Sequence, residues 1–288
     1  MNAVTQPFNA EQYKQTTRQQ WDSAAAAWHR WSPLLNRWLG PATERMLDLC
    51  QIGAGDRVLD VAAGAGEQTL AIARRVGATG EVLATDISEE ILAYAQQTAQ
   101  LAGQDPIRTR VIDGEDLGSL DETPFDAVVS RVGLIYFPDQ HKALQGMKQQ
   151  LKNGGRIGAM VYSSAEKNPF FSIPVSIIRR RAQLPPPLPG QPGPFSLGNK
   201  DVIADLFREA GFTNIDIEAI EAPVRVSSAA ECLQFEQESF GALHQMLSGL
   251  SDSEQDAAWD EIESALLEFE HDGQFVGPCE MLVVAAAR

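Results

Sequence analysis

The chain has 288 residues, 44% of them hydrophobic, which is enough for a sizeable core in one large domain or one domain with an elaborated cap. Its 23 basic and 39 acidic residues give a net charge of −16, which argues against nucleic acid or an anionic membrane surface as the main partner. The three cysteines are far apart and lack histidines at ligand spacing, so we expect neither disulfides nor a metal site. Without a signal pattern or a long apolar run, the chain is predicted to be cytoplasmic, with no integral membrane association.

Residues 1–50 are predicted to form an N-terminal helical cap. Ala10–Leu39 is typical of a helix that breaks near Ser32-Pro33, and a second short helix is expected over Ala42–Cys50. Four tryptophans in this segment are spaced to share one stripe: Trp21, Trp28, Trp31 and Trp38. Such a stripe favours packing between helices over a ligand cage.

Strand and helix patterns alternate through residues 51–162, the predicted ligand-binding core. The expected strands are Val58–Val61, Glu81–Thr85, Ile107–Ile112, Ala127–Ser130 and Arg156–Val161, and the expected helices are Glu67–Val76, Glu89–Leu101 and His141–Leu151. Short Val/Ile-rich strands separated by amphipathic helices indicate an α/β protein with a doubly wound, Rossmann-like parallel sheet.

The alternation stops after Tyr162. Residues 163–220 are expected to complete the core, 221–276 to form a helical lid and 277–288 to form a final strand. Within them we expect a loop at Leu184–Gly198, helices at Lys200–Ala210, Ala229–Leu247 and Ser253–Phe269, and strands at Thr213–Ile220 and Glu280–Ala287. The triplet Arg179–Arg181 is either a solvated helix face or a contact for an acidic substrate.

The stretch RVLDVAAGAGEQTLAIA, Arg57–Ala73, reads as strand, glycine turn and helix. Gly64 and Gly66 fit a cofactor-binding turn or a purely structural one, and Thr69 stands where a dinucleotide fingerprint has its third glycine. Asp60 at the strand end either caps the helix or meets the ligand, where its carboxylate would repel a pyrophosphate and attract an ammonium group. A cationic ligand without phosphate is therefore predicted, and S-adenosylmethionine fits.

The ends of the next two strands supply the expected nucleoside contacts. Asp86 can accept hydrogen bonds from both ribose hydroxyls, and Ile87 can cover one face of the adenine. Asp113 can accept from the adenine amine, a role that its acidic neighbours could share, while Gly114 and Glu115 offer backbone amides to the ring nitrogens.

The fourth strand ends in Ser130 and Arg131, which we expect near the methionine part of the cofactor, although Arg131 could simply pair with an acidic neighbour. Trp28 or Tyr13 could close over the sulfonium by cation–π attraction. The histidines are more typical of surface or structural positions. His29 and His141 lie nearest the predicted crevice and are the candidate catalytic bases, needed only if the acceptor must lose a proton.

Five stretches carry a family resemblance between Arg57 and Tyr162: VLDVAAGAGEQT, ATDIS, DGEDL, FDAVVSRVGLIYFPD and LKNGGRIGAMVY. In this order they resemble the motifs of the class I S-adenosylmethionine-dependent methyltransferases. Within that family the chain is similar to the small-molecule branch that includes the ubiquinone/menaquinone-biosynthesis C-methyltransferases. The resemblance implies a seven-stranded sheet whose last strand is antiparallel and inserts between its predecessors. It also implies that the N-terminal helices and the insertion before the last strand form the substrate lid.

Two departures from the family pattern are visible. Ala62 stands where the first glycine of the family's first motif would fall, and as a cofactor-binding residue it is tolerated if its backbone keeps a negative φ. Gly114 stands where the family commonly has alanine, a departure that is expected to cost nothing sterically.

The sequence therefore predicts methyl transfer by in-line displacement to a small, partly apolar acceptor of quinone, phenol or natural-product type. The alternative is a protein that binds the cofactor without transferring the methyl group, as a scaffold or a cyclisation catalyst. An NAD-dependent oxidoreductase is disfavoured by Asp60 and Thr69. The acceptor, the methylated atom type, the use of a base and the oligomeric state, including a possible homodimer, stay open.

Overall fold

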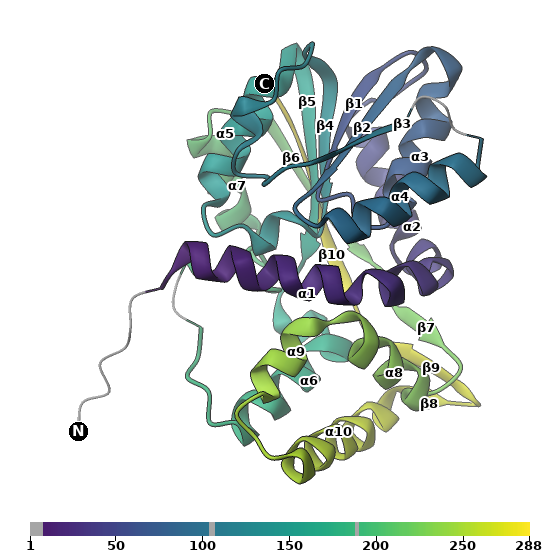
Figure 1. Ribbon diagram of the computed structural model, residues 1–288, viewed down its shortest axis with the longest axis vertical. Helices are drawn as coiled ribbons and strands as arrows, with labels where there is room; N and C mark the ends of the chain where they lie inside the picture. Colours follow the sequence, from purple (N-terminus) through teal and green to yellow (C-terminus); the bar gives the residue numbers. More distant parts are fainter. Residues whose placement is uncertain (1–7, 104–106, 188–189) are drawn as a thin grey trace.

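The computed structural model describes residues 8–103, 107–187 and 190–288 (Figure 1). Its centre is a seven-stranded sheet, whose strands in spatial order are β3 (Ile107–Val111), β2 (Glu81–Asp86), β1 (Arg57–Val61), β4 (Phe125–Arg131), β5 (Leu151–Tyr162), β10 (Glu280–Ala287) and β6 (Thr213–Glu221). β1–β5 pair in parallel, and β10 lies antiparallel between β5 and β6. The predicted sheet, with its inserted antiparallel last strand, is confirmed.

Helices cover both faces of this sheet (Figure 1). One layer holds α2 (Ser32–Leu49), α3 (Glu67–Val76) and α4 (Glu89–Leu101), and the other holds α5 (Gln140–Gln150) and α7 (Lys200–Glu209). The carboxyl ends of β1, β2, β4 and β5 therefore converge on one edge, where ligands bind in open α/β sheets.

A second group of elements lies beyond that edge, with α1 (Ala10–Arg30) running between it and the sheet (Figure 1). This group, called the lid here, comprises α6 (Pro169–Arg181), α8 (Ala229–Ser239), α9 (Gly241–Leu247), α10 (Asp252–Leu266) and the small sheet of β7 (Val224–Val226), β9 (Gln274–Gly277) and β8 (Glu270–His271). Among the described residues, no helix combines the length and apolar character needed to cross a membrane.

The helix boundaries differ from prediction at both ends of the chain. α2 continues through Gly40-Pro41, where two helices were expected, because one continuous buried face packs against the sheet. The expected helix Ala229–Leu247 is two helices, broken at Phe240, whose backbone leaves the helical region. The loop Leu184–Gly198 is irregular wherever it is described, whereas α6 and the small lid sheet were not predicted.

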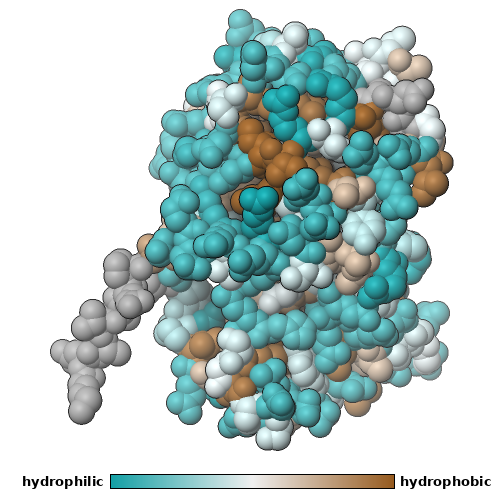
Figure 2. Space-filling model, in the orientation of Figure 1, coloured by the Kyte–Doolittle hydropathy of each residue, from teal (hydrophilic) through white to brown (hydrophobic). Residues whose placement is uncertain are grey.

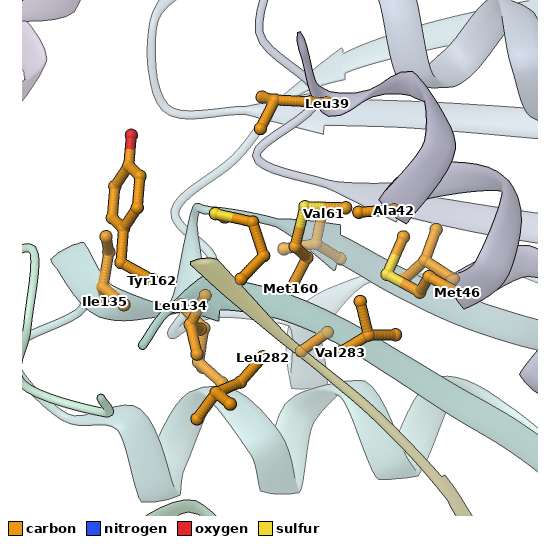
Figure 3. Close-up of a cluster of buried hydrophobic side chains, with 14 of the residues drawn as sticks. Leu39, Ala42, Met46, Val61, Leu134, Ile135, Met160, Tyr162, Leu282 and Val283 are labelled. Carbon is orange, nitrogen blue, oxygen red and sulfur yellow. The ribbon is translucent and has the colours of Figure 1, made fainter. Parts of the chain in front are cut away.

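The core beneath the site joins α2 to the sheet (Figure 3). Met46 of α2 and Val61 of β1 are both almost completely buried. Gly158 of β5 permits this close approach, because a Cβ there would lie 2.4 Å from Cys50 Sγ and 3.0 Å from Met46 Cγ. Tight packing of this kind fixes the strand ends that carry the site.

Candidate functional site

A cavity opens at the carboxyl ends of the parallel strands, beneath α1 and the start of α9; the empty space in it and at its mouth is about 1050 Å³. Most of its polar and aromatic wall belongs to these residues: Lys14, Trp21, Trp28, Gly64, Gln68, Asp86, Asp113, Arg131, Tyr136, Tyr162 and Phe240. On the face shown in Figure 2, hydrophobic residues gather on the sheet side of α1 within a hydrophilic surround.

Two sides of this cavity are built differently and are named here by their strands. The β1–β3 side is formed by Gly64, Asp86, Ile87, Asp113 and Gly114, all of which were predicted from sequence. The β4–β5 side is formed by Arg131 and by aromatic residues of the core and the lid, namely Tyr136, Tyr162 and Phe240.

Asp86 is the polar centre of the β1–β3 side. Its Oδ2 accepts from the Gly64 amide and its Oδ1 from the Ser88 amide, each at 3.0 Å. Burial raises the pKa of Asp86 to about 6, against the effect of these backbone hydrogen bonds. Each carboxylate oxygen has a second acceptor direction, so the group can still take hydrogen bonds from a pair of ligand hydroxyls.

Lys14 of α1 ties the end of β3 to the helix above it. Its Nζ lies 2.8 Å from Asp113 Oδ2 and 2.6 Å from Glu115 Oε2. Although burial works in the opposite direction, these two carboxylates raise the pKa of Lys14. Glu115 does not line the cavity, and its Oε1 accepts from the Asp139 amide at 2.8 Å. Lys14 was missed by sequence reasoning because its partners come from distant motifs.

One sequence expectation about a small residue is wrong. Ala62 has φ +56°, in the left-handed region that favours glycine, where a negative φ was expected. Gly114, which departs from the family pattern, has a steric reason here, because a Cβ would lie 2.5 Å from Phe137 Cζ. Gly66 does not line the cavity. Its φ is +93°, and a Cβ would meet Ala95 Cα at 3.0 Å, so it serves the packing of α3 on α4.

Asp60 does not line the cavity either. Its carboxylate is fully buried and accepts from the Gln68 side-chain amide and, at 2.7 Å, from the Thr69 hydroxyl. Thr69 at the missing glycine position thus holds Asp60. Direct contact between Asp60 and an ammonium group stays a prediction, and this arrangement does not support it, because Gln68 stands in the wall instead.

Gln68 is a candidate that the sequence reasoning did not name. Its Nε2 donates to Asp60, while its Oε1 is buried and has no hydrogen-bond partner among the described residues. Because Gln68 lines the cavity, this carbonyl oxygen offers an acceptor to a cationic ligand group.

Of the two residues predicted at the end of β4, Arg131 lines the cavity and Ser130 does not. Ser130 is fully buried and outside the wall, and its hydroxyl has no partner within the described ranges. Arg131 lines the wall and pairs with Glu67 of α3, with Nη2 and Oε2 3.3 Å apart. Val132, next in the wall, has φ +62°, which is strained for a β-branched residue.

The aromatic wall confirms part of the tryptophan prediction about packing. The Trp21 and Trp28 rings meet edge to face, with centroids 5.3 Å apart, and Trp28 also stacks on Phe235 of the lid. Both tryptophans line the cavity, but Tyr13 does not. Tyr136, 5.8 Å from the Trp21 ring centroid, faces the cavity instead.

Neither candidate histidine base reaches the cavity. His29 stacks on Tyr94 of α4, with ring centroids 4.7 Å apart. His141 stands in the first turn of α5, where its Nε2 lies 2.8 Å from the Gln145 side chain. The expectation that one of them acts as a base at the crevice is therefore not supported by the geometry.

Comparison with known proteins gives the following matches. A family model described as a methyltransferase domain matches residues 52–178. The ubiquinone/menaquinone biosynthesis C-methyltransferase of Idiomarina loihiensis is 35% identical over 126 residues, and this match spans 41% of the chain and about half (47%) of that relative.

A second relative, an uncharacterised protein of Mycobacterium tuberculosis, is 32% identical over 211 residues, which cover 72% of this chain and 70% of that protein. Among solved structures, phosphoethanolamine N-methyltransferase 2 of Haemonchus contortus, in complex with S-adenosyl-L-methionine, superposes with a TM-score of 0.56 at 18% identity. That match covers 93% of this chain and 57% of the other, and it shows a shared fold.

Proposed function

The chain belongs to the class I S-adenosylmethionine-dependent methyltransferases, and from that premise we propose that it methylates a small, partly apolar acceptor of quinone, phenol or natural-product type. S-adenosylmethionine is the cofactor. When bound, it supplies a methyl group on a positively charged sulfur, which becomes a neutral thioether as the acceptor forms its new bond.

The residues present fit this cofactor. Asp86 offers a carboxylate at the end of β2, Ile87 offers an apolar surface, and Asp113 stands in the loop that follows the neighbouring strand β3. The unpartnered Oε1 of Gln68 offers an acceptor to a positively charged amino group. Gly64, at φ +59°, permits close approach of the turn to the Trp28 ring, since a Cβ would lie 3.3 Å from Nε1.

One observation carries the acceptor class: the cavity that holds the cofactor-type residues is also lined by large aromatic side chains, from α1, the core and the lid. These are Trp21, Tyr136, Tyr162 and Phe240. Aromatic walls of this kind favour flat, partly apolar molecules.

The contribution of this chain to the reaction is alignment and the exclusion of water. Holding two reactants in line is worth up to ~7–11 kcal/mol of barrier in favourable cases. Burial raises the pKa of both Tyr136 and Tyr162, so these hydroxyls stay neutral and act as hydrogen-bond donors to the acceptor. Since none of the described residues in the wall is a histidine, we propose that the acceptor reacts without a histidine base.

The test has two stages that separate binding from transfer. Calorimetric titration with S-adenosylhomocysteine should give saturable one-site binding, and the Asp86→Ala variant is the matched negative control. Radiolabelled S-adenosylmethionine is then incubated with a panel of quinols, phenols and aliphatic amines, and label should appear in the aromatic products. Binding without transfer to any of them would favour the scaffold or cyclisation alternative.

The remaining partner expectations rest on the sequence. We propose that nucleic acid is not an acceptor, which the net charge of −16 supports. A cytoplasmic location and a possible homodimer stay predictions.

A further inference from the structure

Arg131 is the cation of the β4–β5 side. It ends β4, in register with Met160 of β5, and its side chain is only 7% exposed. Its positive charge works against the rise in the pKa of Tyr162, which lines the same cavity. The other lining cation, Lys14, is already paired with two carboxylates on the β1–β3 side.

The hydrogen bonding of Arg131 is incomplete. A guanidinium carries five N–H donors in a planar fork, yet among the described residues the Arg131 guanidinium makes one hydrogen bond, at 3.3 Å, to a single oxygen of Glu67. Buried donors in folded proteins are normally satisfied. Most of the fork is therefore available to a group inside the cavity.

The neighbouring carboxylates do not compete for these donors. The other Glu67 oxygen accepts from the Ser32 hydroxyl, and the Glu67 side chain is 2% exposed. Both oxygens of Asp60 are occupied by Gln68 and Thr69. Glu67 thus fixes the position of the guanidinium through one oxygen only. An anion that accepts two parallel N–H hydrogen bonds would fit the guanidinium geometry better.

We propose that Arg131 is a specificity residue that binds an ionised oxygen of the acceptor, a carboxylate, phenolate or enolate, with Glu67 as its positioning residue. The proposal rests on the proposed function. It narrows the acceptor from any small, partly apolar molecule to one that also carries an acidic group. Tyr136 and Tyr162 line the same side, and neither hydroxyl has a hydrogen bond among the described residues, so either can donate to the same oxygen. An acceptor that binds already ionised needs no histidine base.

The cofactor's own methionine carboxylate has the same chemistry, so the test separates the two sources. The acceptor arm titrates 2-naphthoate and its neutral counterpart 2-naphthamide into protein saturated with S-adenosylhomocysteine at pH 7.5. Wild type should prefer the naphthoate by about tenfold or more, the size expected of a charge-assisted bidentate contact. Arg131→Gln should abolish that preference. Arg208→Gln, an exposed arginine paired within α7, is the matched control and should preserve it.

The cofactor arm compares S-adenosylhomocysteine with its decarboxylated analogue. If Arg131→Gln weakens the former and spares the latter while the naphthoate preference persists, the arginine serves the cofactor and the proposal is overturned. If wild type shows no naphthoate preference, or no naphthoate binding at millimolar concentration, the proposal also fails, while cofactor binding leaves the proposed function standing. If S-adenosylhomocysteine itself does not bind wild type, the proposed function fails instead.

Arg131→Gln leaves Glu67 buried without its cation and could unfold the protein, so a second variant is needed. Glu67→Gln keeps a similar shape and can still bond Ser32, but it leaves the charge of Arg131 uncompensated. It should tighten 2-naphthoate by about threefold or more and leave 2-naphthamide unchanged. A damaged fold cannot produce tighter binding that is selective for the anion, and loss of the preference in this variant would contradict the assignment.

Discussion

The two sides of the cavity differ in what holds their functional groups in place. On the β1–β3 side, the polar groups stand in the loops that follow the strands of the sheet, where Asp86 accepts from the backbone amides of Gly64 and Ser88. On the β4–β5 side, the wall includes side chains from outside the sheet, with Phe240 coming from the break between two lid helices. Anchoring by backbone amides at the strand ends suits a cofactor common to a family, whereas a wall completed by the lid lets the acceptor vary.

The sharpest test of this contrast is Asp86→Ala. Removal of a buried carboxylate that accepts ligand hydroxyls should weaken S-adenosylhomocysteine by about 100-fold or more, because hydrogen bonds to charged groups are worth ~1.5–3 kcal/mol each. Calorimetry measures the effect. Tyr162→Phe, on the opposite side, is the comparison variant and should change this affinity by less than about twofold. Equal losses in the two variants would erase the proposed division of the cavity.

Gly114→Ala probes the same side through sterics. The new Cβ would lie 2.5 Å from Phe137 Cζ, so the phenyl ring must move into the region expected to hold the adenine of the cofactor. We expect about a tenfold loss of cofactor affinity, in the range of an overpacking penalty of ~1–3 kcal/mol. Gly53→Ala is the control, because nothing lies within 4 Å of a Cβ there. Gly114→Ala combined with Phe137→Leu should recover most of the affinity, and failure to recover would point to the backbone instead of the ring.

The same contrast explains which parts of the molecule the sequence could predict. Strand ends and motif residues such as Asp86 and Asp113 follow from local periodicity, and the inserted β10 follows from the family resemblance. The break at Phe240 and the run of α2 through Pro41 depend on packing against distant segments, which no local pattern records. Asp60 was placed correctly at its strand end, but its partners were not recognised: Thr69 was noted only as the residue at the missing glycine position, and Gln68 was not named.

The pH dependence of cofactor binding is expected to be a smaller effect. Burial raises the pKa of Asp86 to about 6 from its ordinary ~3.9, with the charge of Asp22 of α1 adding to the rise. Ligand hydroxyls favour the ionised carboxylate, so affinity should approach its full value above about pH 7 and fall by about tenfold or less between pH 7 and pH 5. Calorimetric titrations at these pH values measure it.

Two variants assign that pH dependence. Asp86→Asn should bind weakly and with a flat profile. Asp60→Asn should keep the wild-type profile, although burial also raises the pKa of Asp60 to about 6, because Asp60 lies outside the wall. Their contribution to stability has the opposite sign: between about pH 4 and 6 Asp60 and Asp86 hold more protons in the folded than in the unfolded state, so what these two groups contribute to the free energy of unfolding falls as pH rises.

Backbone strain gives the smallest expected effect, and it is shared by both sides. Ala62 at φ +56° and Val132 at φ +62° follow the neighbouring strands β1 and β4, and both line the cavity. Ala62→Gly relieves the Cβ clash of the left-handed conformation but increases the freedom of the unfolded chain, so we expect a net gain of about 0.5 kcal/mol in the free energy of unfolding. Ala26→Gly, at an exposed position inside α1, should instead lose about 1 kcal/mol. Chemical denaturation of the two variants should therefore show changes of opposite sign in the free energy of unfolding for the same alanine-to-glycine substitution. If Ala62→Gly instead lowers the free energy of unfolding, the packing of the Ala62 Cβ stabilises the fold by more than its left-handed backbone destabilises it. Packing would then explain why alanine is tolerated in the first motif.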